Sequence, residues 1–183
     1  MYAQISKSII TNNNALVINN NGYTSIKDSI ILNNTVIVNT TSNYTLDYNW
    51  WGNTLDNLSK PFSNINNWLV LNATANVNAL EVNQVALIAL TFYLNNSQIK
   101  YSNLPEIDFK TSALNGNLVK NSKSRLTYTL TALEDGQVTV NYNDIYYNLD
   151  FKFLKSNPNL SAKSSDIMVG DDFPNDIEGA QIF

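Results

Sequence analysis

The residues of this chain that could do chemistry are few, and their types exclude most catalytic arrangements. The chain contains no histidine and no cysteine, which excludes nucleophile–histidine catalysis, imidazole and thiolate metal sites and a disulfide framework. Within residues 1–53 the only acids are Asp28 and Asp47, and the only bases are Lys7 and Lys27. The two aspartates do not occupy equivalent positions of the repeat described below, so they do not predict the paired carboxylates of a glycoside hydrolase. We therefore predict that the protein is not an enzyme and has no catalytic residue, no cofactor and no metal site.

The composition narrows the class of protein further. Charged residues make up 14% of the 183 residues, the formal net charge is −4, and asparagine occurs 32 times. Arg125 is the single arginine, so the chain lacks the basic surface that nucleic-acid binding requires. The longest apolar run, Val85–Leu90, is far too short to span a bilayer, which predicts no membrane insertion within the chain. Met1–Gln4 has no feature of a secretory leader, so we expect any signal or anchor to lie outside this sequence.

A repeat of about twenty residues occupies the beginning of the chain. The stretch "ISKSIITNNNALVI", which starts at Ile5, aligns with "IKDSIILNNTVIVN", which starts at Ile26, at a period of 21. The stretch "LDYNWWGN", from Leu46, continues the alignment at a period of 20. Units of this length without helical periodicity are typical of a β-solenoid, in which each unit forms one coil. The alternative is compositional drift in a chain rich in asparagine and isoleucine.

The repeat also places asparagines at equivalent positions. Asn12, Asn33 and Asn53 follow the first strand of the three successive units. In a parallel stack, identical side chains lie above one another, and amide side chains can then hydrogen-bond along the axis. We predict an asparagine ladder at these three positions.

The adjacent residues Trp50 and Trp51 take the strand position that isoleucine pairs hold in the two preceding units. A solenoid of fewer than three units cannot bury a core alone, and its terminal units are atypical. Since a large aromatic ring buries about 150–250 Å², we predict that the pair covers the open end of the solenoid as a cap. Gly52 would let the backbone turn out of the stack. The alternatives are a platform on which a ligand such as a sugar stacks, and a loop with neither role.

The pattern of apolar and polar residues changes after the repeat. Residues 57–67 are polar and non-periodic and are predicted to be a linker, which leaves residues 1–56 as the terminal coils with their tryptophan cap. Residues 68–153 contain several strand patterns and no convincing helix, which favours an antiparallel β-sandwich of the immunoglobulin-like (Ig-like) kind. Residues 154–183 resemble a linker and the truncated start of a further repeat, and we expect them to be poorly ordered.

Several strands and turns of the sandwich can be located. Trp68–Ala75 is the first predicted strand, and Val85–Leu94 is apolar in both phases, as expected for a central strand covered on both faces. Asn115-Gly116 and Asp135-Gly136 predict hairpin turns, and Asn143-Asp144 separates the last two strands.

The chain also carries Asn-x-Ser/Thr sequons, at which surface exposure would permit glycosylation. The candidate acceptors are Asn33, Asn39, Asn43, Asn57, Asn95 and Asn159.

These features resemble the adhesin-like surface proteins of gut methanogenic archaea. The resemblance rests on the Asn/Ile/Thr-rich solenoid ending in "DYNWWGN" and on "NWLVLNATANVN" at the start of the Ig-like part. It implies an all-β chain: the last coils of a right-handed parallel β-helix of the pectin-lyase-like type, followed by an antiparallel Ig-like β-sandwich. It also implies a non-enzymatic module at the cell surface that serves adhesion or structural display, with surface glycans or proteins of host or neighbouring cells as partners. The alternative function is a carbohydrate-binding or carbohydrate-processing β-helix.

Overall fold

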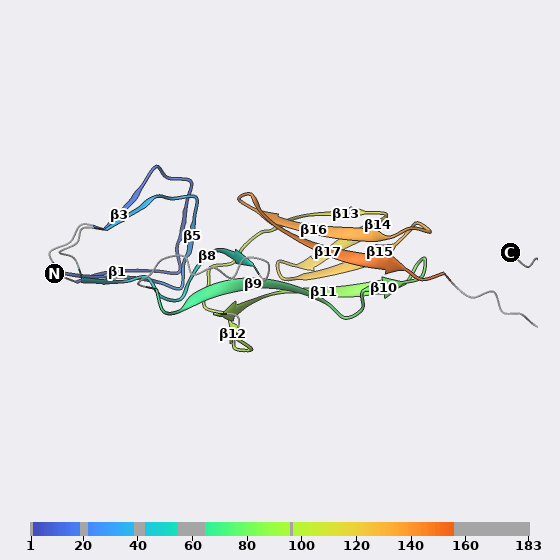
Figure 1. Cartoon of the computed structure of the whole chain (residues 1–183), viewed down its shortest axis with the longest axis horizontal. Helices are drawn as coiled ribbons and strands as arrows, with labels where there is room; N and C mark the ends of the chain where they lie inside the picture. The colour runs from blue at the N-terminus through green and yellow to red at the C-terminus, as the bar shows by residue number, and fades with distance from the viewer. Residues whose placement is uncertain (1, 19–21, 39–42, 55–64, 96, 156–183) are drawn as a thin grey trace, which may run out of the picture.

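The computed structural model describes residues 2–18, 22–38, 43–54, 65–95 and 97–155. Over these ranges the chain is all-β, as predicted, and contains no helix. The N-terminal strands lie at one end of an elongated molecule and the C-terminal strands at the other (Figure 1). The predicted linker lies outside the described residues as far as residue 64, and the predicted tail lies outside them from residue 156. The described ranges include no helix of the length and apolar character that a bilayer crossing needs.

The N-terminal stack, strands β1–β8, consists of three successive passes of the chain. The first pass contains β1 (Tyr2–Ser6), β2 (Ile9–Thr11) and β3 (Leu16–Ile18); the second contains β4 (Tyr23–Lys27), β5 (Ile30–Leu32) and β6 (Val36–Val38); the third contains β7 (Asn43–Thr45) and β8 (Asn49–Thr54). All pairing between passes is parallel, in the orders β1-β4-β7, β2-β5-β8 and β3-β6. In the view of Figure 1 the successive passes lie one behind another, so they overlap and outline a loop.

The register confirms the periods in the sequence. Ile9 pairs with Ile30, 21 residues later, and Ile30 pairs with Trp50, 20 residues later. Side chains at one set of equivalent positions in the three passes reinforce this register. The backbone N–H of Ser8 donates to Oγ of Ser29 at 3.1 Å, and the backbone N–H of Ser29 donates to Oδ1 of Asn49 at 2.9 Å. Equivalent positions in the three passes are therefore linked through side-chain acceptors as well as through the strands.

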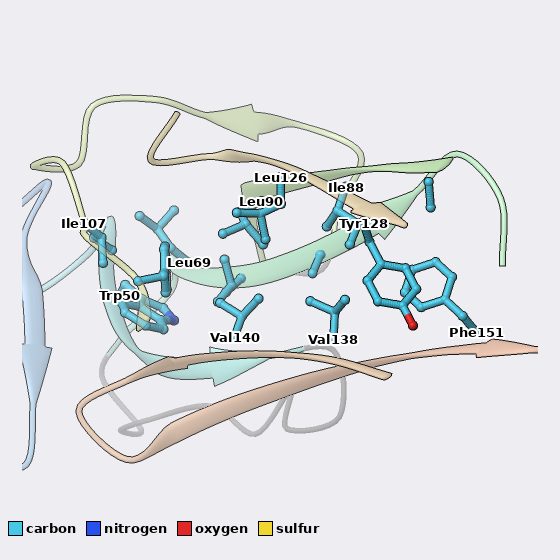
Figure 2. Packing of buried hydrophobic residues seen from close by; sticks show 14 of the residues in the cluster. Trp50, Leu69, Ile88, Leu90, Ile107, Leu126, Tyr128, Val138, Val140 and Phe151 are labelled. Atoms are coloured by element: carbon cyan, nitrogen blue, oxygen red, sulfur yellow. The ribbon is translucent and has the colours of Figure 1, made fainter. Parts of the chain in front are cut away.

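The C-terminal unit consists of strands β9–β17. These are β9 (Trp68–Ala75), β10 (Ala79–Leu80), β11 (Val85–Leu94), β12 (Lys100–Tyr101), β13 (Lys110–Leu114), β14 (Gly116–Ser122), β15 (Arg125–Leu130), β16 (Gly136–Tyr142) and β17 (Ile145–Phe153). One sheet has the order β10-β17-β16-β13. The facing sheet has the order β14-β15-β11-β9 and continues without a break into β8-β5-β2 of the N-terminal stack. Buried side chains from both sheets form one cluster, in which Ile88 and Tyr128 face Val138 and Phe151 (Figure 2).

Strand β9 belongs to both units. It pairs in parallel with β8, where Trp50 lies opposite Leu69, and in antiparallel fashion with β11, where Leu71 lies opposite Phe92. Both edges of β9 are thus hydrogen-bonded, one to each unit. The boundary between the units is a shared sheet.

The strand predicted by Val85–Leu94 forms as β11, and it is central because β9 and β15 pair with its two edges. The prediction that both of its faces are covered is wrong. Its first half alternates between exposed and buried residues, and Val85 and Leu87 are 47% and 56% exposed. One face packs against the facing sheet, and on the other face Val85 and Leu87 remain open to solvent.

Two of the three predicted turns do not form hairpins. Asn115-Gly116 joins β13 to β14, and Asp135-Gly136 joins β15 to β16, but in each case the two strands belong to different sheets. Only Asn143-Asp144 connects a paired hairpin, β16–β17, with φ values of 46° and 63°. Left-handed backbone at both central residues is what a type I′ hairpin turn requires.

The glycines of the two crossovers are needed for a close approach to Tyr128. A Cβ atom at Gly116 would lie 2.2 Å from Cε2 of Tyr128, and one at Gly136 would lie 1.9 Å from its Oη. The Tyr128 ring is fully buried, stacks on Phe151 at a centroid distance of 4.6 Å, and donates its hydroxyl to the carbonyl of Leu114 at 3.0 Å. Both crossovers therefore close over a single aromatic side chain.

This packing predicts different rescue behaviour for two alanine substitutions. Gly116→Ala and Gly136→Ala should each lower the free energy of unfolding by about 1–3 kcal/mol, because each overpacks a filled core. Adding Tyr128→Phe should recover part of the Gly136→Ala loss, since it removes the Oη atom nearest to that Cβ. It should recover less of the Gly116→Ala loss, because Cε2, the atom nearest to that Cβ at 2.2 Å, remains. Urea unfolding of the single and double variants measures both couplings, and equal rescue of the two would contradict the packing described.

Candidate functional site at the junction between the two units

Trp50 lies in the C-terminal cluster and is fully buried. Its ring makes edge contacts with Phe92 and Phe109, at centroid distances of 5.1 and 6.3 Å, and lies 6.2 Å from Tyr142. Its Nε1–H donates to the backbone carbonyl of Asn53 at 2.9 Å. Edge-to-face aromatic contacts of this kind add to the stabilisation from buried area. The ring fills the end of the C-terminal core.

Trp51 points to the opposite side of β8 and is half-buried. Together with Trp68 it packs against the core of the N-terminal stack, which includes Ile31 and Ile65. Successive side chains of a strand point to opposite faces, so the two neighbouring tryptophans cannot cover the same core. The edge of β8 that would otherwise form the open end of the stack is paired with β9. The predicted cap is thus divided, with one ring in each of the two cores.

Gly52 occupies an irregularity in the β8–β9 pairing, between Trp50 and Thr54. Its φ of +91° is unfavourable for residues with a side chain. A Cβ atom there would lie 3.0 Å from Cδ1 of Ile145 and 3.3 Å from Cδ2 of Leu32. Gly52 therefore permits both the backbone irregularity and the close approach of β17 to the N-terminal stack.

Asn12 and Asn33 of the predicted asparagine ladder are hydrogen-bonded to each other in the structure. Nδ2 of Asn33 donates to Oδ1 of Asn12 at 3.0 Å, and both residues have left-handed φ values, 54° and 57°. A second rung, absent from the prediction, joins Nδ2 of Asn13 to Oδ1 of Asn34 at 3.0 Å. In the third pass Gly52, next to Asn53, has a positive φ of 91°, and Asn53 is buried with 4% of its surface exposed.

The sequon asparagines differ in their surroundings. Asn33 and Asn43 are exposed. Asn95 is half-buried, accepts the backbone N–H of Trp68 at 2.5 Å and donates Nδ2 to the carbonyl of Asn66 at 2.7 Å. Its amide therefore ties the β11–β12 loop to the start of β9, which no sequence signal indicated. The other three candidates, Asn39, Asn57 and Asn159, lie outside the described residues.

The two aspartates of the N-terminal stack hold structural positions. Asp28 is 9% exposed and accepts a hydrogen bond from the hydroxyl of Tyr101, which lies in β12 of the C-terminal unit. Tyr101 also stacks on Tyr48 at a centroid distance of 6.0 Å. Oδ1 of Asp47 accepts the backbone N–H groups of Asn66 and Asn67, at 2.8 and 3.1 Å. Each aspartate thereby contacts a segment that follows the repeat.

The electrostatics of the Asp28–Tyr101 contact follow from its surroundings. Burial, and then the hydrogen bond to Asp28 and its charge, raise the pKa of Tyr101 well above its usual value near 10. The phenol therefore stays neutral and acts as a donor.

No group of three or more acidic, histidine or cysteine side chains that could hold a metal ion occurs within the described ranges.

The division of the tryptophan pair predicts unequal effects of substitution. Trp50→Ala should lower the free energy of unfolding by about 3–5 kcal/mol, because it empties a fully buried site. Trp51→Ala, the matched control on the neighbouring residue, should cost less because its ring is only half-buried. Urea unfolding followed by circular dichroism measures both losses. A larger loss for Trp51→Ala would contradict the placement of the two rings.

The raised pKa of Tyr101 predicts a loss of stability in alkali. The pKa is higher in the folded than in the unfolded chain, so this group's contribution is complete below about pH 10 and decreases as the pH rises above that value. The difference in unfolding free energy between the wild type and Tyr101→Phe should therefore shrink as the pH rises above about 10. Tyr146→Phe, at a residue that is 59% exposed, is the control for the loss of a phenol outside the junction. A Tyr101→Phe difference that does not change with pH would refute the assignment.

Comparison with protein-family models, with curated proteins and with solved structures gave no match for this chain. The functional interpretation therefore depends on the residues and on the junction geometry described above. That geometry consists of a shared strand, a divided tryptophan pair and an aspartate–tyrosine contact between the two units.

Proposed function

We propose that this chain is a non-enzymatic, adhesin-like module of the cell surface that acts as a rigid stalk or spacer in adhesion or structural display. In this proposal the N-terminal stack is the end of a right-handed parallel β-helix, and the C-terminal unit is an Ig-like β-sandwich. The observation that carries the proposal is the double pairing of β9, with β8 on one edge and β11 on the other. A spacer has to keep a fixed geometry between its parts, and a shared sheet provides one.

Features of each unit support the proposed folds. Parallel registers of 21 and 20 residues, with asparagine and serine side chains linking the passes, are the pattern of a β-helix. Two facing sheets with mainly antiparallel pairing and a buried core favour a sandwich.

Three contacts outside the β8–β9 ladder support a rigid junction. Trp50 of β8 packs inside the C-terminal cluster. The carboxylate of Asp28 accepts the hydroxyl of Tyr101. Gly52 allows Ile145 of β17 to approach the stack. Because these contacts reach several different strands of the C-terminal unit, rotation of one unit against the other would break several of them together.

The competing function, a carbohydrate-processing β-helix, is less well supported. Such enzymes need acids or bases that are free to act on a bound sugar. The only two acids of residues 1–53, Asp28 and Asp47, already accept structural hydrogen bonds. Screening the full chain against immobilised glycans and whole cells separates the remaining possibilities: saturable binding supports adhesion through this module, and its absence supports a spacer.

The spacer proposal predicts a single fixed distance between the units. The chain has no cysteine, so spin labels can be attached specifically to an Asn14→Cys/Leu133→Cys variant, whose two positions are exposed and lie in different units. Electron–electron double resonance should give one narrow distance distribution, because the shared sheet prevents hinge motion.

The matched control is Lys110→Cys/Leu133→Cys, with both labels in the C-terminal unit. The distribution between the units should be no broader than this internal reference. A clearly broader or two-population distribution would contradict a rigid spacer, whatever ligands the module binds.

A further inference from the structure

A pocket of about 370 Å³ lies in the C-terminal unit beside β11, β12 and the segment that leads to β13. Its lining includes the buried side chains of Leu90, Ile107 and Phe109. Tyr101, which Asp28 of the N-terminal stack holds by its hydroxyl, forms part of the wall. The volume falls within the range of small-molecule sites, about 300–1,000 Å³. The pocket therefore has an apolar floor and a wall anchored by the junction.

The charged residues of the lining are mostly basic. Lys100, Lys123 and Arg125 line the pocket, with Glu106 as the only acid among the lining residues. Nζ of Lys123 forms an ion pair with Oε2 of Glu106 at 2.6 Å, so these two charges offset each other. The described residues provide no hydrogen-bond or ion-pair partner for the side chains of Lys100 and Arg125. The lining thus retains two positive charges in a chain whose formal net charge is −4.

Arg125 is the only arginine of the chain. Its backbone is fixed in β15, where it pairs with Ala89 of β11 and with Ser122 of β14. A guanidinium group has planar donors that match the two oxygens of a carboxylate. A lysine in the lining of the same pocket can contact the anion as a point charge. Arg125 and Lys100 together therefore favour a carboxylate.

We propose that this pocket binds a carboxylic acid whose body is a single ring. The carboxylate contacts Arg125 and Lys100, and the ring lies over the apolar floor formed by Leu90, Ile107 and Phe109. A bare inorganic anion would leave this apolar surface without a partner, and a neutral sugar would leave the two cations without one. The neutral phenol of Tyr101 adds no negative charge to the wall. Because a spacer needs no ligand, this site goes beyond the proposed function and does not depend on it.

Two classes of compound combine a carboxylate with a single ring: acidic sugars and aromatic acids. The test is a titration of the ¹⁵N-labelled full chain by NMR with three probes: sodium glucuronate, sodium phenylacetate and neutral methyl β-glucoside. At least one carboxylate should cause saturable shifts of amide signals around the pocket, and the probe that does so identifies the class. The neutral glucoside should cause none.

Variants distinguish the site from general attraction of anions. Arg125→Gln should weaken binding of the active carboxylate about tenfold or more, since charge-assisted hydrogen bonds are the stronger class, and Lys100→Gln should weaken it to a smaller extent. Lys110→Gln is the control, because it removes an exposed positive charge outside the pocket, and it should bind as the wild type does. The proposal is overturned if neither carboxylate shifts the pocket signals, if the glucoside shifts them equally, or if Arg125→Gln binds like Lys110→Gln.

Discussion

The structure depends on the requirement that both edges of β9 be hydrogen-bonded. An unpaired strand edge exposes a row of backbone donors and acceptors. At β9 one edge is satisfied by β8 of the N-terminal stack and the other by β11 of the C-terminal unit. Separating the units would therefore uncover an edge on each of them. The parallel order of the stack and the mainly antiparallel order of the C-terminal unit meet on this one strand.

The shared sheet also explains why β5 and β8 carry large apolar residues on both faces. Ile30, Trp50 and Leu69 lie in register across β5, β8 and β9, and all three belong to the C-terminal cluster. Their neighbours Ile31 and Trp51 belong to the core of the stack. Adjacent large apolar residues in these strands thus serve two different cores. The C-terminal unit extends from the side of the stack that β5 and β8 form (Figure 1).

Periodicity in the sequence was sufficient to predict several of the strands and the spacing of the passes. The predicted bounds of β9 and β11 agree with the structure, as do the registers of 21 and 20 residues. The pattern could not show which sheet a strand joins, because alternation reports a buried face and not a partner. Asn115-Gly116 and Asp135-Gly136 were for this reason predicted to form hairpins, whereas they cross between sheets around Tyr128.

The candidate site was predictable only in part. The Asn12–Asn33 rung follows from the repeat, but the contacts of Asn95 with β9 and of Asp28 with Tyr101 join residues 27 and 73 positions apart. No local pattern encodes such contacts. The three tryptophans have a further practical consequence, since Trp50, Trp51 and Trp68 account for every indole in the chain and all lie on β8 or at the first residue of β9. The intrinsic tryptophan emission of the intact protein is therefore a label-free spectroscopic reporter of the junction alone.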